Sequence, residues 1–226
     1  MRQKIGKKIL FYAFILVFFG TFNNQKLPGL SLLDVKDIII ESSDNSNFSD
    51  ILDKISDQKK SNIFLISKDN IKKTIEANSL VENYFVIKNY PSTLKIKIIK
   101  TKFLSRLNIE GKIFLVGTNG KLTEDLFNKT ELPFIFGNPS INYILDFNNK
   151  IINSKFDINE FTNLFYYKSG RWDLETKDGV IIKLSNEKNL SKQLEEIFVI
   201  MSNKNFVNKK IIDARVNNQI IFYDWK

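Results

Sequence analysis

The hydrophobic pattern opens with an unbroken apolar run near the N-terminus, Ile9 to Phe22. As an α-helix these 14 residues span about 21 Å, which is shorter than the ~30 Å hydrocarbon core of a bilayer. Extended back to Ile5, with Lys7 and Lys8 reaching the headgroups, the run becomes long enough to cross with slight thinning. We therefore predict a transmembrane anchor over residues 9–23, although the core of a signal peptide would also match the short run.

The residues that flank the run help to distinguish a transmembrane anchor from a signal peptide. The segment Gly20-Thr21-Phe22-Asn23-Asn24 holds no cleavage site of small residues, which favours an uncleaved anchor. Basic residues precede the run, and the positive-inside rule keeps such residues in the cytoplasm. They are Arg2, Lys4, Lys7 and Lys8. We therefore predict a cytoplasmic tail over residues 1–8, with Lys4, Lys7 and Lys8 flanking the anchor, and an exported chain beyond it.

A connector over residues 24–33, with Pro28-Gly29 as its turn signal, leads into a regular pattern. Over residues 34–102 this pattern predicts the order strand, helix, helix, strand, strand. The expected elements are a strand from Val35, a helix over 48–55 behind Asn47, a helix over 68–77 behind Ser67, and strands over 81–88 and 94–98 around the turn Asn89-Tyr90-Pro91-Ser92. Lys95 and Lys97 alternate with apolar residues, so we expect them on the solvent face of a sheet that rests on the two helices.

Residues 103–226 predict a second domain, a mostly antiparallel sheet with packed helices. Asn119-Gly120 and Asp178-Gly179 stand between apolar segments and supply the positive φ angles of tight hairpins. Helical spacing predicts one helix from Asp157, with Phe161, Leu164 and Phe165 buried, and another over 190–201. Strands over 211–215 and 219–225 close the chain. The expected fold class is α+β behind a single N-terminal transmembrane helix.

Composition narrows the chemistry that the chain can perform. Its 226 residues include no His and no Cys, which excludes Ser-His-Asp and Cys-His catalysis and nearly all zinc sites. The acidic neighbours Glu124-Asp125, Asp173 with Glu175, and Glu195-Glu196 are expected to be solvated surface pairs. The net charge of +9 comes from dispersed lysines, so we expect no nucleic-acid partner. We predict no enzyme, no catalytic or metal-binding residue, no cofactor and no small-molecule substrate.

The last strand carries the candidate binding residues, because apolar side chains fall on both of its faces. Ile221, Tyr223 and Trp225 share one face, while Ile220 and Phe222 share the other. At a sheet edge such a strand needs a covering partner, and strand addition by a partner segment would supply one. An inner strand of the sheet would show the same pattern. The predicted partner-binding residues are Gln219, Ile220, Ile221, Phe222, Tyr223 and Trp225.

Several segments of the chain are similar to segments of one known protein family. VENYFVIKNYPSTLKIKIIKTKFLSRL from Val81 is similar to the closing strands of its POTRA-type domain, and GRWDLETKDGVIIKLS from Gly170 is the most specific match. GKIFLVGTNGKL, ELPFIFG and IIDARVNNQIIFY are similar to parts of its β domain. With the basic tail, the anchor and the element order, the chain resembles the FtsQ/DivIB family. Val216 and Gln219 depart from the residues common in some members.

The resemblance implies a bitopic inner-membrane protein of the divisome, with its bulk in the periplasm at the division septum. In the family, such a protein binds FtsB and FtsL and helps to recruit and regulate septal peptidoglycan synthesis during the cell cycle. Two alternatives stay open. One is a POTRA-bearing chaperone or secretion component, which usually continues into a membrane β-barrel, and the other is a periplasmic hydrolase that acts through carboxylates.

Overall fold

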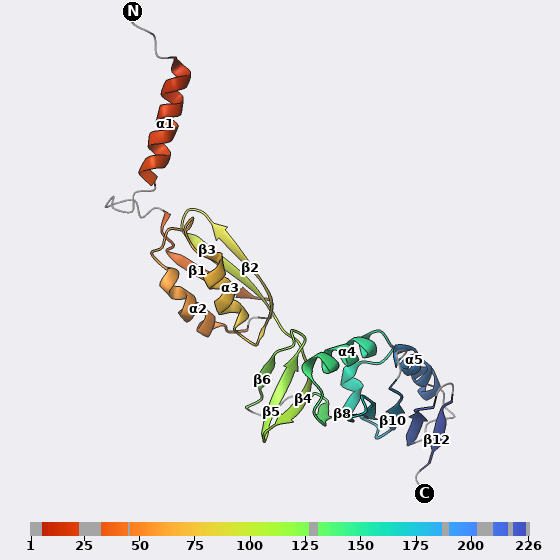
Figure 1. Ribbon diagram of the computed structural model, residues 1–226. Helices are drawn as coiled ribbons and strands as arrows, with labels where there is room; N and C mark the ends of the chain where they lie inside the picture. Colours follow the sequence, from red (N-terminus) through yellow and green to blue (C-terminus); the bar gives the residue numbers. More distant parts are fainter. Residues whose placement is uncertain are drawn as a thin grey trace, which may run out of the picture.

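The computed structural model describes residues 6–22, 33–44, 46–126, 131–186, 190–202, 210–216 and 219–224. Along the chain it forms a helix, a three-stranded unit (described residues 33–100) and a nine-stranded unit (described residues 103–224), as Figure 1 shows. Each unit has its own cluster of buried apolar side chains. Helices and sheets thus combine in an α+β fold, as the sequence predicts.

The first helix, α1, spans Lys7–Phe22 and is apolar around its whole circumference. Its apolar side chains lie exposed, for example Phe11 and Leu16. Among the described residues, no helix has both the length and the apolar character needed to cross a membrane. Of the predicted anchor-flanking lysines, Lys8 is exposed in α1, whereas Lys4 and the side chain of Lys7 lie outside the described part.

The three-stranded unit has the predicted β-α-α-β-β order. It comprises β1 (Asp37–Ser42), α2 (Ser49–Ile55), a 3₁₀ turn (Ser56–Gln58), α3 (Lys68–Glu76), β2 (Val81–Asn89) and β3 (Thr93–Lys100). The strand order is β1-β3-β2, with β1 parallel and β2 antiparallel to β3. Leu94, Ile96 and Ile98 are buried under the helices and Lys97 is exposed, so the predicted alternation in β3 is confirmed.

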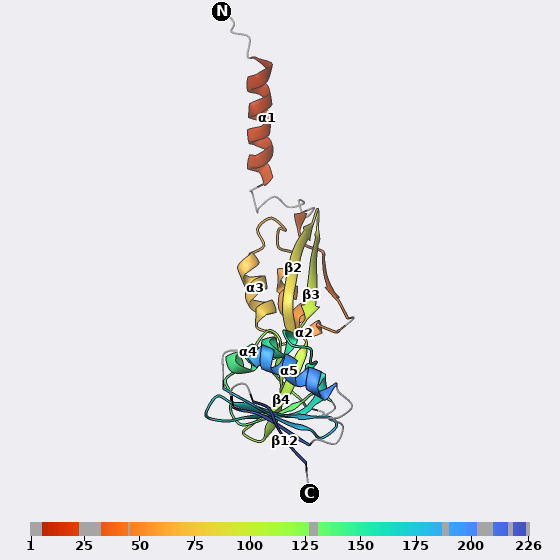
Figure 2. The same cartoon turned by 90° about the vertical axis from the view of Figure 1, so that its right-hand side faces the viewer.

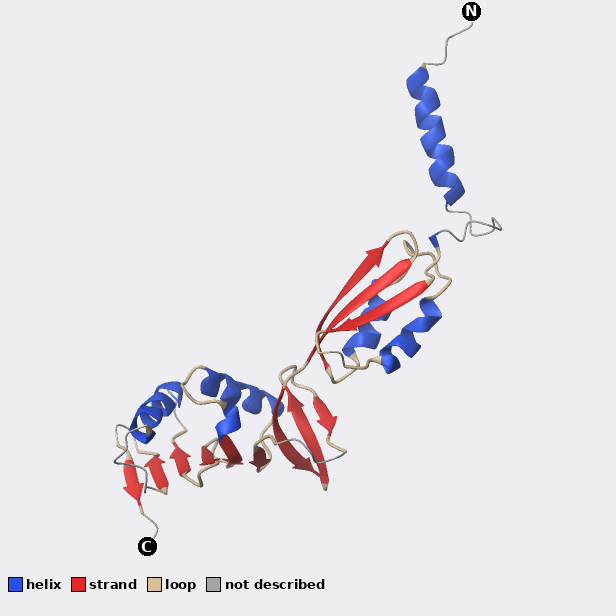
Figure 3. Cartoon of the chain, turned by 180° about the vertical axis from the view of Figure 1, so that it is seen from behind, coloured by secondary structure: helices blue, strands red, loops and turns tan. Residues whose placement is uncertain are grey.

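The nine-stranded unit is a mixed sheet with helices on one face, as Figures 2 and 3 show. Its elements are β4 (Phe103–Ile109), β5 (Lys112–Gly117), β6 (Leu122–Glu124), β7 (Phe134–Phe136), α4 (Ile141–Ile152), a 3₁₀ turn (Ile158–Glu160), β8 (Phe161–Tyr166), β9 (Trp172–Thr176), β10 (Ile181–Leu184), α5 (Leu190–Met201), β11 (Ile211–Ala214) and β12 (Ile221–Tyr223). The strand order is β12-β11-β10-β9-β8-β7-β4-β5-β6.

Two helical crossovers build the core of this sheet. The parallel neighbours β7 and β8 are joined through α4, and the parallel neighbours β10 and β11 are joined through α5. Crossovers between parallel strands need a long connection, which a helix supplies. Phe147 of α4 stacks on Trp172 of β9 at a centroid distance of 4.4 Å. The sheet face opposite the two helices has no covering element among the described residues, as Figure 2 makes visible.

Two predictions for this unit are wrong. The segment from Phe161 is the strand β8, where a helix was expected, because a register shift between Phe161 and Asn163 buries Phe161 and Leu164 at a helix-like spacing of three residues. The helix α4 was not expected at all. Its buried positions include Asn148, a polar residue that interrupts the apolar periodicity. The hairpins at Gly120 and Gly179 are as predicted, since both glycines have positive φ.

Side-chain hydrogen bonds join the two units. Asn119, in the β5–β6 turn, donates through Nδ2 to the carbonyl oxygens of Ser79 and Val81 at 2.9 and 2.8 Å. The carboxylate of Glu82 accepts from the hydroxyl groups of Thr101 and Thr118 at 2.8 and 2.7 Å. We call these residues the joint. It connects the end of the three-stranded unit at α3 and β2 with the start of the nine-stranded unit.

Candidate protein-binding edge

The strand β12 forms one end of the nine-stranded sheet. It pairs antiparallel with β11, and no described strand lies on its other side. Ile221 and Tyr223 are 40% and 47% exposed, whereas Ile220 and Phe222 are half-buried and pack against the core. The predicted alternation of faces is therefore present. Gln219 is exposed before the strand, and Trp225 lies outside the described residues.

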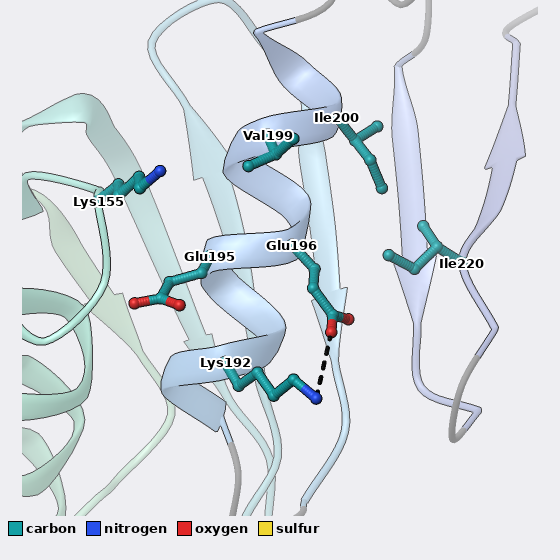
Figure 4. Close-up of a pocket in the computed structure, with 7 residues that line it drawn as sticks. All are labelled: Lys155, Lys192, Glu195, Glu196, Val199, Ile200 and Ile220. Carbon is teal, nitrogen blue, oxygen red and sulfur yellow. Dashed lines mark ion pairs between the residues drawn. The ribbon is translucent and has the colours of Figure 1, made fainter.

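On the helix side, the segment that leads into β12 borders a hollow of about 490 Å³ against α5. Figure 4 shows Ile200 of α5 and Ile220 facing one another across it. Val199 adds an exposed apolar side chain, and Lys192 pairs with Glu196 at 3.8 Å on the rim. The remaining lining residues are Lys155 and Glu195. Apolar surface thus lies on both sides of the β12 edge.

Charged side chains cross the uncovered face of the sheet next to β12. Strand register places Ile221 beside Asp213, Asp213 beside Lys183, and Lys183 beside Asp173. Arg215 makes a two-pronged contact with Asp213, with Nε to Oδ1 at 2.8 Å and Nη2 to Oδ2 at 2.5 Å. Alternating charge in neighbouring strands is favourable, since opposite charges then lie opposite one another.

A second arginine repeats the arrangement two strands away. Arg171 donates from Nε to Oδ1 of Asp173 at 3.1 Å, and its guanidinium lies 4.2 Å from the ring centre of Tyr167. Both aspartates are buried, whereas the side chain of Arg215 remains 44% exposed. Arg215 therefore presents a polar group to solvent beside the apolar edge.

The two aspartates respond differently to their surroundings. Hydrogen bonds from Arg215 lower the pKa of Asp213, and those same bonds raise the pKa of Arg215. Burial raises the pKa of Asp173, and Arg171 only partly offsets that effect. Asp213 is thus stabilised as a carboxylate, while the ionised form of Asp173 carries a desolvation cost.

Aromatic rings occupy the same uncovered face farther from β12. Phe136 stacks on Phe165 at 5.1 Å, Phe134 lies 4.9 Å from Phe136, and the Arg106 guanidinium lies 6.0 Å from the Phe134 ring. Phe136 is exposed. The face therefore changes from charged near β12 to aromatic near β7.

The arginine-aspartate pairs were not predicted from the sequence, and the burial of one acidic residue was not expected. Asp173 is buried, so its expected solvation is wrong, whereas Glu195 and Glu196 are exposed as expected. The missed signal is the pair of mirrored tripeptides Arg171-Trp172-Asp173 and Asp213-Ala214-Arg215. Residues two apart in a strand share a face, so each tripeptide brings its charges together.

The chain is similar to several known proteins. The family model for the POTRA domain, FtsQ-type, matches residues 33–100. "Cell division protein FtsQ" of Rickettsia bellii (strain RML369-C) is 27% identical over 188 residues, which cover 82% of this chain and 70% of that protein. The protein of the same name from Rickettsia typhi (strain ATCC VR-144 / Wilmington) is 24% identical with the same coverage. The structure of the major extracytoplasmic domain of the cell-division protein DivIB from Geobacillus stearothermophilus aligns with a TM-score of 0.35 and 13% identity, covering 46% of this chain and 94% of that one.

Proposed function

We propose that this FtsQ/DivIB-like cell-division protein is a non-enzymatic scaffold of the divisome that binds its partners through the β12 edge. The family resemblance seen in the sequence is confirmed by the POTRA match and by the FtsQ relatives. In this proposal the chain helps to recruit and regulate septal peptidoglycan synthesis, and its partners are FtsB and FtsL, as the family resemblance implies.

The observation that carries the proposal is that no described strand pairs with the outer side of β12. An exposed strand edge offers main-chain donors and acceptors to an added strand. Side chains of an added strand alternate between two faces. On one face they would meet Ile221 and Tyr223, and on the other they would meet the hollow beside Ile200 and Ile220. The edge therefore offers affinity through its backbone and specificity through both flanking surfaces.

The exposed Arg215 adds a polar rim to this edge. Asp213 already neutralises part of its charge, so a partner carboxylate would compete with an existing pair and gain little net affinity. We assign Arg215 a role in register and orientation, while Ile221 and Tyr223 supply the buried area.

The proposal includes a membrane-anchored arrangement. Residues 1–8 form a cytoplasmic tail, residues 9–23 a single-pass inner-membrane anchor, and residues 24–33 a linker. Residues 34–102 form the POTRA-like domain and residues 103–226 the FtsQ-type β domain in the periplasm. The apolar circumference of α1 and the basic residues before it support this orientation.

The binding proposal is tested with the full chain in detergent or nanodiscs, titrated with a complex of FtsB and FtsL from the same organism. The double variant Ile221→Ala, Tyr223→Ala should weaken capture at least tenfold, because aliphatic and aromatic anchors at an interface centre carry much of its affinity. The control Tyr143→Ala, Ile152→Ala removes an exposed tyrosine and an exposed isoleucine from α4, away from the β12 edge. Unchanged affinity of the β12 variant, with its fold intact, would contradict the proposal.

A further inference from the structure

Three large apolar side chains gather at one end of the three-stranded unit. Phe64, Leu65 and Tyr90 are 58%, 61% and 57% exposed. Phe64 and Tyr90 stack with ring centres 4.8 Å apart and planes inclined by 24°. We call these three residues the aromatic tip. Exposed apolar clusters of this kind usually mark an interaction site.

The local fold holds the tip outward. Ile63 and Ile66 are buried on either side of Phe64 and Leu65. The turn between them is fixed by Asn62, whose Oδ1 accepts from the Phe64 amide at 3.0 Å and whose carbonyl accepts from the Leu65 amide at 2.9 Å. Since the flanking isoleucines are anchored in the core, Phe64 and Leu65 have no room to turn inward.

The tip lies where the chain enters the unit. The Ile63 amide donates to the carbonyl oxygen of Leu33 at 2.8 Å, and Asp34 bridges to Asn62. In Figure 1 this end of the unit faces the N-terminal side, opposite the end that carries the joint. Ten residues separate Phe22 from Leu33, and a chain of ten residues spans at most roughly 35 Å. Leu33, whose carbonyl oxygen bonds to the residue just before Phe64, is therefore tethered within about that distance of the end of α1.

We propose that the aromatic tip contacts the surface of the bilayer in which α1 is anchored, which extends the membrane arrangement proposed above. A ring with one polar end, such as that of Tyr90, is favoured at the interface between headgroups and hydrocarbon, while Phe64 and Leu65 can bury apolar surface just below the headgroups. The tether raises the effective concentration of the bilayer around the tip, so three side chains suffice for a contact that a free domain would not keep.

The charges near the tip decide what kind of contact it makes. Backbone hydrogen bonds bring residues 33–37, 56–63 and 92 together at this end of the unit. These segments and the end of β2 carry Lys36, Lys59, Lys60 and Lys88 together with Asp34, Asp37 and Asp57. The ammonium of Lys88 lies 3.4 Å from the carbonyl oxygen of Phe64. The opposite charges nearly cancel, so apolar insertion rather than attraction to anionic lipid drives the contact. The contact should therefore persist at high salt.

The absence of cysteine from the sequence allows a clean test. The full chain carries an environment-sensitive fluorophore at Leu65→Cys, or at the control Ala77→Cys, which is exposed at the joint end. Each is reconstituted into liposomes of phosphatidylcholine with or without phosphatidylglycerol. We expect a blue-shifted emission at position 65, quenched by nitroxide lipids in both mixtures and at 50 and 500 mM salt, and neither effect at position 77.

Adding Phe64→Ser and Tyr90→Ser should reduce the blue shift at position 65 at least by half without changing the melting temperature by more than a few degrees. Equal spectra at positions 65 and 77 would overturn the proposal. A blue shift that grows with the protein-to-lipid ratio, without nitroxide quenching, would also overturn the proposal. That result would mean that the tip contacts a second copy of the chain and not the lipid. Flotation of the liposomes tests the proposed membrane anchor separately. If the chain does not float with the liposomes, the anchor proposal is contradicted, whatever the fluorescence at position 65 shows.

Discussion

The side-chain amide of Asn119 donates to the carbonyl oxygen of Val81, 2.8 Å away across the junction between two sheets. Val81 begins β2 of the three-stranded unit, and Asn119 sits in the β5–β6 turn of the nine-stranded unit. Through this bond, a hairpin turn of one unit is fixed to a strand of the other. The entry end of the three-stranded unit and the β12 edge then lie at opposite ends of the two joined units, as Figure 1 shows.

Asn119→Ala should therefore weaken the coupling between the units. The change removes both bonds that the Nδ2 group makes to the three-stranded unit, and we expect a loss of about 1–3 kcal/mol in the free energy of unfolding. Calorimetry should show one unfolding transition broadening toward two. Asn108→Ala is the matched control, because Asn108 bonds only within its own hairpin, to the amide of Gly111. Equal effects of the two variants would count against a coupling role.

The two buried aspartates should respond to pH with opposite sign. The native pKa of Asp213 is lowered by Arg215, so its carboxylate contributes stability that is present above an unfolded pKa of about 3.9 and is lost as pH falls through the native value. The native pKa of Asp173 is raised by burial, so its ionisation costs stability once pH rises through that value.

The free energy of unfolding, measured with urea between pH 3 and 7, should distinguish the effects of the two aspartates. Relative to the unmodified chain, Asp213→Asn should become less stable as pH rises toward about 4 and beyond, reaching a deficit of about 1–3 kcal/mol at pH 7. Asp173→Asn should become relatively more stable as pH rises above about 4. Parallel pH profiles for the two variants would show that burial and the arginine contacts do not act as argued.

The three-stranded unit should fold without the nine-stranded unit. Its thirteen-member buried cluster, which includes Ile63, Leu94 and Ile96, is made entirely of its own residues. Residues 33–102 expressed alone should unfold cooperatively and give dispersed NMR signals, since the helices and sheet bury their apolar faces on each other. A gradual melt would mean that the contacts at the joint are needed for this unit to fold.

Sequence patterns predicted the elements whose burial follows a regular period. In β3, strict alternation around Leu94 and Ile96 matches the structure. Where a local irregularity changes the period, the prediction fails. The register shift near Phe161 gives a strand the burial spacing of a helix. Buried Asn148 interrupts the apolar pattern of α4, so that helix was not predicted. The joint and the aromatic tip depend on residues distant in sequence, such as Asn119 with Val81 or Phe64 with Tyr90. No local pattern could have brought these pairs together.

Proline substitutions in β12 should distinguish a free edge from an inner strand. The amide and carbonyl of one strand residue point to the same side, and successive residues alternate, so Phe222 and Tyr223 present their amides to opposite sides. Proline removes a backbone donor. At one of the two positions this disrupts pairing with β11, and at the other it removes a donor that points to the outer side of β12. One of the variants Phe222→Pro and Tyr223→Pro should therefore lose stability. The other should keep its melting temperature within a few degrees yet lose binding of FtsB and FtsL. If neither variant loses binding while folded, the partner does not add a strand at this edge, and the hollow beside Ile200 or the uncovered sheet face must carry the contact instead.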